Sequence, residues 1–307
     1  MLRAFDAVTE LFLANLEQSQ RRSSQAMQEL SSGYKMSRPS DAPADVVTVL
    51  HVQSDVSRAT QVQSNLNRLQ NEVNISEGTI RTSISVMDRI TVLGTQALGL
   101  AQTAETRSGI LSQLRGLQTQ LVGLTQLKVQ GRYVFSGDKD GAAQYSLDAT
   151  NTVTGVKRNF QTADTRQITD VLGSTFTAGL TAERLFDHRN TDDSVAADNV
   201  FAAIEQLAQG LANNDSDEIE QAMIAMDDAG AWLNTNLTFY GSVQNRITDS
   251  LAMANKYQIQ WQTQLSQLRD ADTAEAITTL ETSRTQQEAA LAAQANFGAR
   301  SLFDFLR

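Results

Sequence analysis

The chain offers few side chains that could perform catalysis or bind a metal, and these lie far apart in the sequence. It contains no cysteine, which excludes thiolate metal sites, disulfides and thiol catalysis. Its only histidines are His51 and His188, and neither has a second histidine at helical spacing. We therefore expect both histidines to be solvent-exposed and neither to hold a metal.

Acidic residues supply the remaining candidates for chemistry. Residues 138–141 (Asp-Lys-Asp-Gly) resemble the start of a calcium loop, but Ala149 stands where that loop needs a glutamate, so a hairpin turn is expected. The aspartate pairs at 192–193 and 227–228 are adjacent and do not share a helix face, which favours capping or solvated charge. Phosphate-binding glycine loops and nucleophile motifs do not occur. The sequence therefore predicts no enzyme and no catalytic, cofactor-binding or metal site.

Charge and composition narrow the classes of partner. The 307 residues carry a net charge of −10, which disfavours a nucleic-acid partner. No apolar run approaches about 20 residues, so no membrane insertion is expected. Asp6, Glu10 and Glu17 interrupt the first apolar positions, and no small-residue cleavage site follows, so we expect no cleaved signal peptide. With two prolines and 6% aromatic residues, the composition favours long helices over a thick globular core.

Apolar residues recur at alternating steps of three and four, which predicts long coiled-coil-like helices. In the first helix this stripe comprises Leu2, Phe5, Thr9, Phe12, Leu16, Ser19, Ser23, Ala26 and Leu30. A second helix is expected from near Ala44, and its stripe comprises Leu66, Leu69, Val73, Ser76, Ile80, Ser83, Met87, Ile90, Gly94, Ala97 and Ala101. Further helices are expected after a break near 106–109, from near Asp198, and from 219 to 268 with Ser216 as the cap. The last would be about 75 Å long, so we expect an elongated helical bundle.

The character of the sequence changes between about residues 131 and 190. It becomes rich in Gly, Asp and Thr, and short alternating runs at 132–135, 152–160 and 166–172 predict strands joined by turns. We therefore expect a small, mostly β insertion in the mainly α fold.

A joint interrupts the helices at residues 30–43 (LSSGYKMSRPSDAP), which contain both prolines of the chain. Glycine is suited to a left-handed helix C-cap, proline fixes φ and removes a backbone donor, and serine or aspartate can cap the next helix. The residues with these roles are Gly33, then Pro39 and Pro43, and Ser40 or Asp41.

The joint also carries a resemblance to a known family. Its pattern L-S-S-G-x-[KR]-[IM]-x-x-P-S-D-x-P is similar to the N-terminal signature of bacterial flagellin-family axial proteins, in the P-S-D-x-P form that hook–filament junction members tend to carry. Residues 131–137 (GRYVFSG) resemble the G-x-Y-x-F-S-G element that opens the insertion in those members. Residues 270–272, 293–296 and 301–303 resemble parts of the C-terminus of the family.

The resemblance implies a structural component of the bacterial flagellum, a hook–filament junction protein. It also implies an extracellular location reached without a cleaved signal peptide. The implied partners are other copies of the chain, flagellin, an adjacent hook-associated junction protein, and an export chaperone at the C-terminal segment. A filament-forming flagellin is the alternative. A cytoplasmic signalling coiled coil ranks lower, because it explains neither the insertion nor the joint.

The helix pattern and the resemblance divide the chain into three parts. Residues 1–40 and 270–307 are expected to form terminal helices of an inner tube, 41–130 and 191–269 a bundle, and 131–190 the β-rich insertion, which the resemblance places facing outward. We expect this insertion to be dispensable for assembly, because the resembling ends lie outside it and exposed modules tolerate insertions best. The terminal stripes are thin in apolar residues, so these helices gain stability by packing against copies or neighbours. Their expected assembly contacts are Phe5, Phe12, Leu16, Leu30, Leu302 and Phe305.

Overall fold

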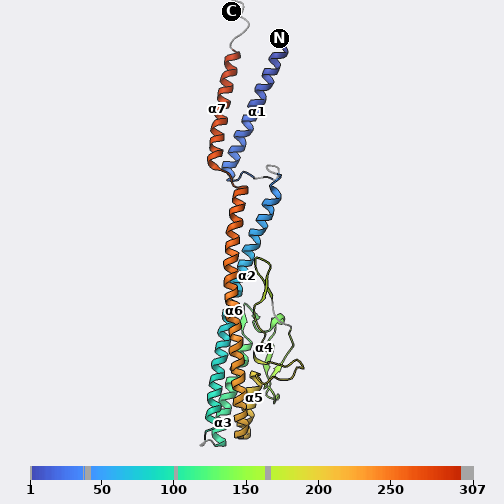
Figure 1. Ribbon diagram of the computed structural model, residues 1–307, viewed down its shortest axis with the longest axis vertical. Coiled ribbons are helices and arrows are strands. Elements are labelled where there is room, and N and C mark those ends of the chain that lie inside the picture. The colour runs from blue at the N-terminus through green and yellow to red at the C-terminus, as the bar shows by residue number, and fades with distance from the viewer. Residues whose placement is uncertain (1, 37, 39–42, 100–102, 163–166, 299–307) are drawn as a thin grey trace, which may run out of the picture. The chain divides into compact units, whose positions relative to one another are not determined.

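The computed structural model describes residues 2–36, 38, 43–99, 103–162 and 167–298 (Figure 1). Over these residues the chain forms seven α-helices and six short strands, which confirms the mainly helical class with a small β insertion. Within the described ranges, no helix is long and apolar enough to cross a membrane. The chain divides into two compact units, residues 1–58 with 256–307 and residues 59–255. The three-part division above stays a prediction.

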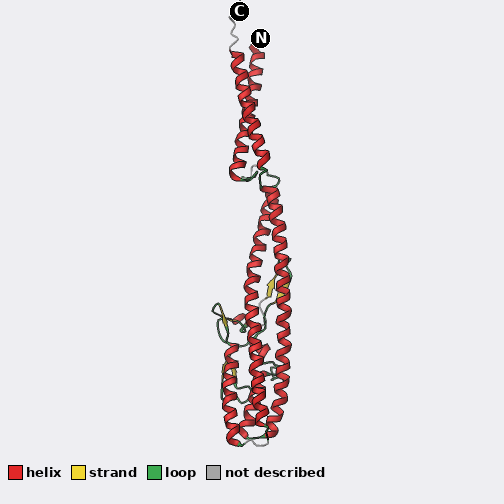
Figure 2. Ribbon diagram, turned by 90° about the vertical axis from the view of Figure 1, so that its left-hand side faces the viewer, coloured by secondary structure: helices red, strands yellow, loops and turns green. Residues whose placement is uncertain are grey.

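The first unit contains a helical hairpin and the ends of two longer helices. Helices α1 (Leu2–Ser32) and α7 (Thr273–Gly298) lie side by side in both views (Figures 1 and 2). The start of α2 (Val46–Ala97) and the end of α6 (Ser216–Arg269) belong to the same unit and share a small apolar cluster. Its buried members are Met36, Val49, Val52 and Leu265.

The second unit is a bundle whose core follows the predicted stripes. The remainder of α2 and α6 packs with α3 (Ala104–Thr125) and α5 (Val200–Asn213) around one apolar cluster. On α2 the buried members of the predicted stripe are Leu66, Leu69, Val73, Ser76, Ile80, Ser83, Met87, Ile90 and Ala97. Each fully buried aliphatic side chain contributes about 1.5–3 kcal/mol, so this unit holds most of the apolar stabilisation.

Two helix starts differ from the expectation. The break predicted near 106–109 ends earlier, because Thr103 and Thr106 form a capping box that starts α3 at Ala104. Helix α6 begins at Ser216, but its cap is Asp215. The Asp215 carboxylate accepts hydrogen bonds from two backbone N–H groups of the first turn at 2.9 and 3.2 Å.

The insertion contains three separate antiparallel strand pairs and one short helix. The pairs are β1 (Lys128–Val129) with β2 (Arg132–Tyr133), β3 (Tyr145–Leu147) with β4 (Val156–Arg158), and β5 (Gln167–Thr169) with β6 (Thr175–Thr177). Helix α4 (Ala182–Phe186) follows them. The three predicted strands are present but shorter, and β1, β3, β6 and α4 were not predicted. Residues 137–139 form a 3₁₀ turn rather than the tip of a hairpin.

The insertion shares the core of the bundle, which explains why its strands are short. Phe135, Tyr145 and Phe186 are fully buried in the same cluster as α5. The Phe186 and Phe201 rings stack with centroids 6.0 Å apart, and Phe135 meets Phe186 edge to face at 6.4 Å. Tyr145 belongs to β3, whereas Phe135 follows β2 and Phe186 is the last residue of α4. The insertion therefore contributes to the stability of the bundle, and its dispensability for assembly stays a prediction.

Candidate assembly site

The joint after α1 is tied to the connection between α6 and α7. Gly33 has a φ of +75°, the left-handed value expected of a C-cap glycine, and its N–H donates to Glu29 O at 2.8 Å. Tyr34 and Asp270 form an antiparallel bridge. The Arg269 guanidinium lies 4.1 Å from the centroid of the Tyr34 ring, in cation–π contact. The two connections therefore hold each other in place.

The fully buried side chains between α1 and α7 are small. Ser19 is buried, and its hydroxyl donates to Ser283 O at 2.9 Å. Ala26 and Ala276 are also buried on the two helices. Small side chains remove little apolar area from water, so this helix pair gains much less free energy from burial than the bundle does.

Large apolar side chains lie on the solvent side of the same two helices. On α1, Leu11, Leu13 and Met27 are 65%, 54% and 50% exposed, and on α7 Ile277 and Leu291 are 48% and 54% exposed. We call these five residues the outer apolar set. These side chains are free of contact with the rest of the subunit over about half of their surface, so they are available to contact another subunit.

The residues predicted as assembly contacts and as the joint are only partly described. Phe12, Leu16 and Leu30 are half-buried on the same stripe of α1 as its buried small residues, so they belong to the inner face. Pro43 is exposed in the turn before α2. The side chain of Phe5 and the residues Pro39, Asp41, Leu302 and Phe305 lie outside the described part of the chain. The assembly contacts therefore stay a prediction.

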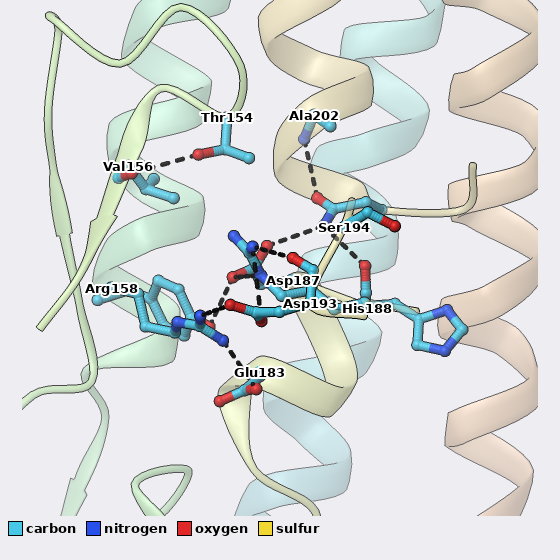
Figure 3. Close-up of polar contacts among 12 residues, drawn as sticks. Thr154, Val156, Arg158, Glu183, Asp187, His188, Asp193, Ser194 and Ala202 are labelled. Atoms are coloured by element: carbon cyan, nitrogen blue, oxygen red, sulfur yellow. Dashed lines mark hydrogen bonds and ion pairs between the residues drawn. The ribbon is translucent and has the colours of Figure 1, made fainter. Parts of the chain in front are cut away.

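A network of charged side chains binds the insertion to the bundle (Figure 3). Arg158 of β4 donates to Glu183 of α4 at 3.0 Å and to Asp193 of the following loop at 2.6 Å. The hydrogen bond from Arg158 lowers the pKa of Asp193, whereas burial raises the pKa of Glu183. One guanidinium thus connects a strand, a helix and a loop.

Asp187, the residue after α4, is completely buried and accepts three side-chain hydrogen bonds. The donors are the Tyr145 hydroxyl at 2.8 Å, Asn199 Nδ2 at 2.8 Å and Arg189 Nε at 2.9 Å. Burial and the neighbouring carboxylate raise the pKa of the Tyr145 hydroxyl. A buried carboxylate already bonded by three donors is a structural anchor rather than a general base.

One of the two histidines departs from the expectation. His51 is exposed, as predicted. His188 is half-buried rather than solvent-exposed, because its ring stacks on Trp232 at 3.9 Å and its Nδ1 lies 2.6 Å from Asp198 Oδ1. The prediction failed because Trp232 lies on α6, far away in sequence.

The aspartate pair at 192–193 splits into two roles. Asp192 accepts hydrogen bonds from the backbone N–H and hydroxyl of Ser194, which is the capping role that was expected. Asp193 instead forms an ion pair with Arg158, so its charge is not simply solvated. The two residues lie in a turn, where Asp193 has a left-handed φ of +63° and its side chain reaches Arg158 of β4.

Arg107 is a buried charge that the sequence did not reveal. Its Nε donates to Ala97 O at 3.1 Å, Nη1 donates to Asn214 O at 3.0 Å and to Asn214 Oδ1 at 2.8 Å, and Nη2 donates to Ser216 Oγ at 2.8 Å. A cation at the C-terminal carbonyls of α2 and α5 is also favoured by the helix dipoles. One side chain on α3 therefore joins the ends of three other helices.

Glu205 is a further buried charge that the sequence did not reveal. It accepts hydrogen bonds from Arg115, with Nη2 at 2.9 Å from Oε1, and from Gln118 at 3.4 Å. Gly155 of the insertion lies directly on this group with a φ of +67°, and a Cβ at that position would collide with both Gln118 and Glu205. The glycine is therefore what lets the insertion loop pack onto α3 and α5.

The two ends of the chain match known sequence families. Residues 7–140 match the bacterial flagellin N-terminal helical region, and residues 217–306 match the bacterial flagellin C-terminal helical region. The chain belongs to the bacterial flagellin family. The matched regions of this flagellin-family chain include the joint, the α1–α7 hairpin and the long helices α2 and α6. The flagellin family is one of structural proteins.

Individual relatives are more distant. A flagellin from Clostridium tyrobutyricum is 24% identical over 173 residues, which cover 54% of this chain and 46% of the relative. The chain thus spans about half the length of that flagellin.

Solved structures share the fold of this flagellin-family chain. One is a putative flagellar hook-associated protein from Vibrio parahaemolyticus, which is 18% identical with a TM-score of 0.64, covering 75% of this chain and 100% of the other. Another is the flagellar hook-associated protein 3 from Legionella pneumophila, which is 13% identical with a TM-score of 0.59, covering 72% and 98%.

Proposed function

We propose that this flagellin-family chain is a structural subunit of the bacterial flagellum that joins the hook to the flagellin filament. Family membership supports the flagellar role. The observation that carries the junction role is the proline-containing joint at 30–43, supported by the GRYVFSG element at 131–137. The fold shared with two proteins named as hook-associated agrees with it.

The outer apolar set supports assembly with other copies and with neighbouring flagellar subunits. Its five side chains are large and exposed, while the fully buried residues of the hairpin are small. Covering the set in a polymer would remove apolar area that the monomer leaves in water. A helical polymer repeats each contact in every subunit, so a modest gain per contact is multiplied. Flagellin and an adjacent hook-associated protein are the proposed neighbours.

Export without a cleaved signal peptide, an extracellular location and a chaperone on the C-terminal segment belong to the same proposal. The exposed apolar residues of α7 support the chaperone, because an unassembled subunit would otherwise carry them uncovered in the cytoplasm. A chaperone-deficient cell should degrade or aggregate the subunit. Normal export from such a cell would contradict this part of the proposal.

A deletion strain tests the junction role directly. Cells that lack this chain should build hooks without filaments and shed flagellin into the medium, and the intact gene supplied on a plasmid should restore filaments. Filaments of normal length in the deletion strain would contradict the proposal. Growth of the purified chain alone into long filaments would favour the filament-forming alternative instead.

A further inference from the structure

The loop between α4 and α5 (residues 187–199) meets α6 through a pair of stacked rings. The His188 imidazole lies parallel to the Trp232 indole, with centroids 3.9 Å apart and an interplanar angle of 10°. The Trp232 Nε1 donates to Arg184 O at 3.0 Å, which holds the indole against the end of α4. The His188 Nδ1 lies 2.6 Å from Asp198 Oδ1 on the opposite side of the loop.

These contacts suit a protonated imidazole better than a neutral one. A cation over the face of an indole is attracted by the ring quadrupole, and this attraction is strongest for tryptophan. The Asp198 carboxylate adds a charge-assisted hydrogen bond once the imidazole is a cation. Both contributions grow when a proton binds, and histidine is the ordinary side chain whose charge changes between pH 5 and 8.

Several other charged side chains lie on the elements packed around this contact. They are Asp187, Arg189, Asp192, Asp193 and Asp198 in the loop, Glu183 and Arg184 on α4, and Asp227 and Asp228 on α6. Asp187 and Arg189 form an ion pair with each other, and Asp193 pairs with Arg158. Carboxylates ordinarily titrate near pH 4 and arginine stays charged, but burial raises the pKa of Glu183, so the His188→Gln comparison below separates its response from that of the ring pair. The group that faces the indole is the histidine.

We propose that His188 is a proton-operated latch, which closes the 187–199 loop onto α6 more tightly when its imidazole is protonated. Asp187 and Asn199 anchor the two ends of the loop in the buried network, so opening is confined to the residues between them. The latch rests on contacts within the second unit and does not depend on the junction role.

Tryptophan fluorescence tests the latch, because a protonated imidazole in contact with an indole quenches its emission. The chain has two tryptophans, so Trp261→Phe leaves Trp232 as the single reporter. Its emission should fall as the pH is lowered from 8 to 5.5. Adding His188→Gln should abolish this change, whereas the control His51→Gln should preserve it. Trp232 emission that does not change with pH in the Trp261→Phe chain would overturn the proposal. Equal quenching after His188→Gln is added would overturn it as well.

Thiol labelling measures closure of the loop independently of fluorescence. The chain has no cysteine, and Ala196 is buried in the middle of the loop, so Ala196→Cys creates a single reporter of opening. At each pH the labelling rate is divided by the rate for the same chain carrying His188→Gln. This ratio removes the effect of pH on the ionisation of the introduced thiol, because both chains share it. This ratio should fall about two- to fivefold between pH 8 and pH 6, the range for an exposed cation–π contact. A ratio that is the same at both pH values would overturn the latch.

Discussion

At the scale of single residues, Asp193 and Glu183 accept hydrogen bonds from the same guanidinium but respond to pH in opposite directions. Arg158 lowers the pKa of Asp193, so this contact stabilises the fold above about pH 4 and is lost as the pH falls through the lowered value. Burial raises the pKa of Glu183, so its contribution is fully present below about pH 4 and is lost as the pH rises through the raised value.

We therefore expect Asp193→Asn and Glu183→Gln to have different effects on the free energy of unfolding at pH 7. Asp193→Asn should lower the free energy of unfolding at pH 7 and have little effect at pH 3. Glu183→Gln should not lower it at pH 7, because the substitution removes a buried negative charge. Urea unfolding at pH 7 and pH 3 measures both differences. A loss in Glu183→Gln as large as that in Asp193→Asn would contradict the assignment.

Arg107 is expected to be the most sensitive charged residue of the bundle. Its guanidinium makes four hydrogen bonds to three residues at helix ends, and Arg107→Met would leave buried oxygen acceptors without donors. We expect a loss of about 2–4 kcal/mol in the free energy of unfolding. The control Arg81→Met removes an exposed pair with Glu77 and should cost less than about 1 kcal/mol. Equal losses in urea unfolding would show that Arg107 does not join the helix ends.

At the scale of elements, α3 carries three glycines at seven-residue intervals. Gly109, Gly116 and Gly123 are exposed, and a Cβ at any of them would meet nothing. Glycine inside a helix is less favourable than alanine, so each Gly→Ala change should raise the stability of the monomer by about 0.5–1 kcal/mol. Gly155→Ala is the opposite control, since that position has a positive φ and its Cβ would collide with Glu205.

Thermal unfolding measures the glycine series. The three changes in α3 should add, because the positions are two turns apart and share no partner. Destabilisation of the free monomer by Gly116→Ala would mean that another part of the chain packs on this face. A neutral Gly155→Ala would mean that the insertion loop does not lie on Glu205.

At the scale of the whole molecule, one face of the hairpin packs within the subunit and the other is proposed to contact other subunits. The adjacent residues Phe12 and Leu13 test the two faces separately. Leu13 is exposed, so Leu13→Asp should leave the unfolding temperature of the free subunit unchanged while filaments are lost from the hook. Phe12 is half-buried on the inner face, so Phe12→Ala should cost the monomer about 1–2 kcal/mol, roughly half the value for a fully buried site. Calorimetry measures the stability of the free subunit, and the amount of flagellin shed into the medium measures the loss of filaments. Normal filaments in the Leu13→Asp strain would remove Leu13 from the assembly surface.

The sequence predicted the long helices and the C-cap glycine of the joint. The stripe from Leu66 to Ala97 is the buried face of α2, and Gly33 has the left-handed φ that a C-cap requires. These features are local, because a heptad stripe, a cap or a proline acts over one or two helical turns.

The sequence alone therefore determined the helices, the place of the insertion and the resemblance to the flagellin family. Only the tertiary structure decided that Phe12 belongs to the inner face, that His188 stacks on Trp232, and that Phe135 is buried in the bundle. Periodicity defines a face of a helix but not what covers it. The partners of Arg107, Glu205 and His188 lie many residues away in the sequence or on other elements, and only packing brings them together. Contacts between distant segments depend on how the helices meet, which no local pattern encodes.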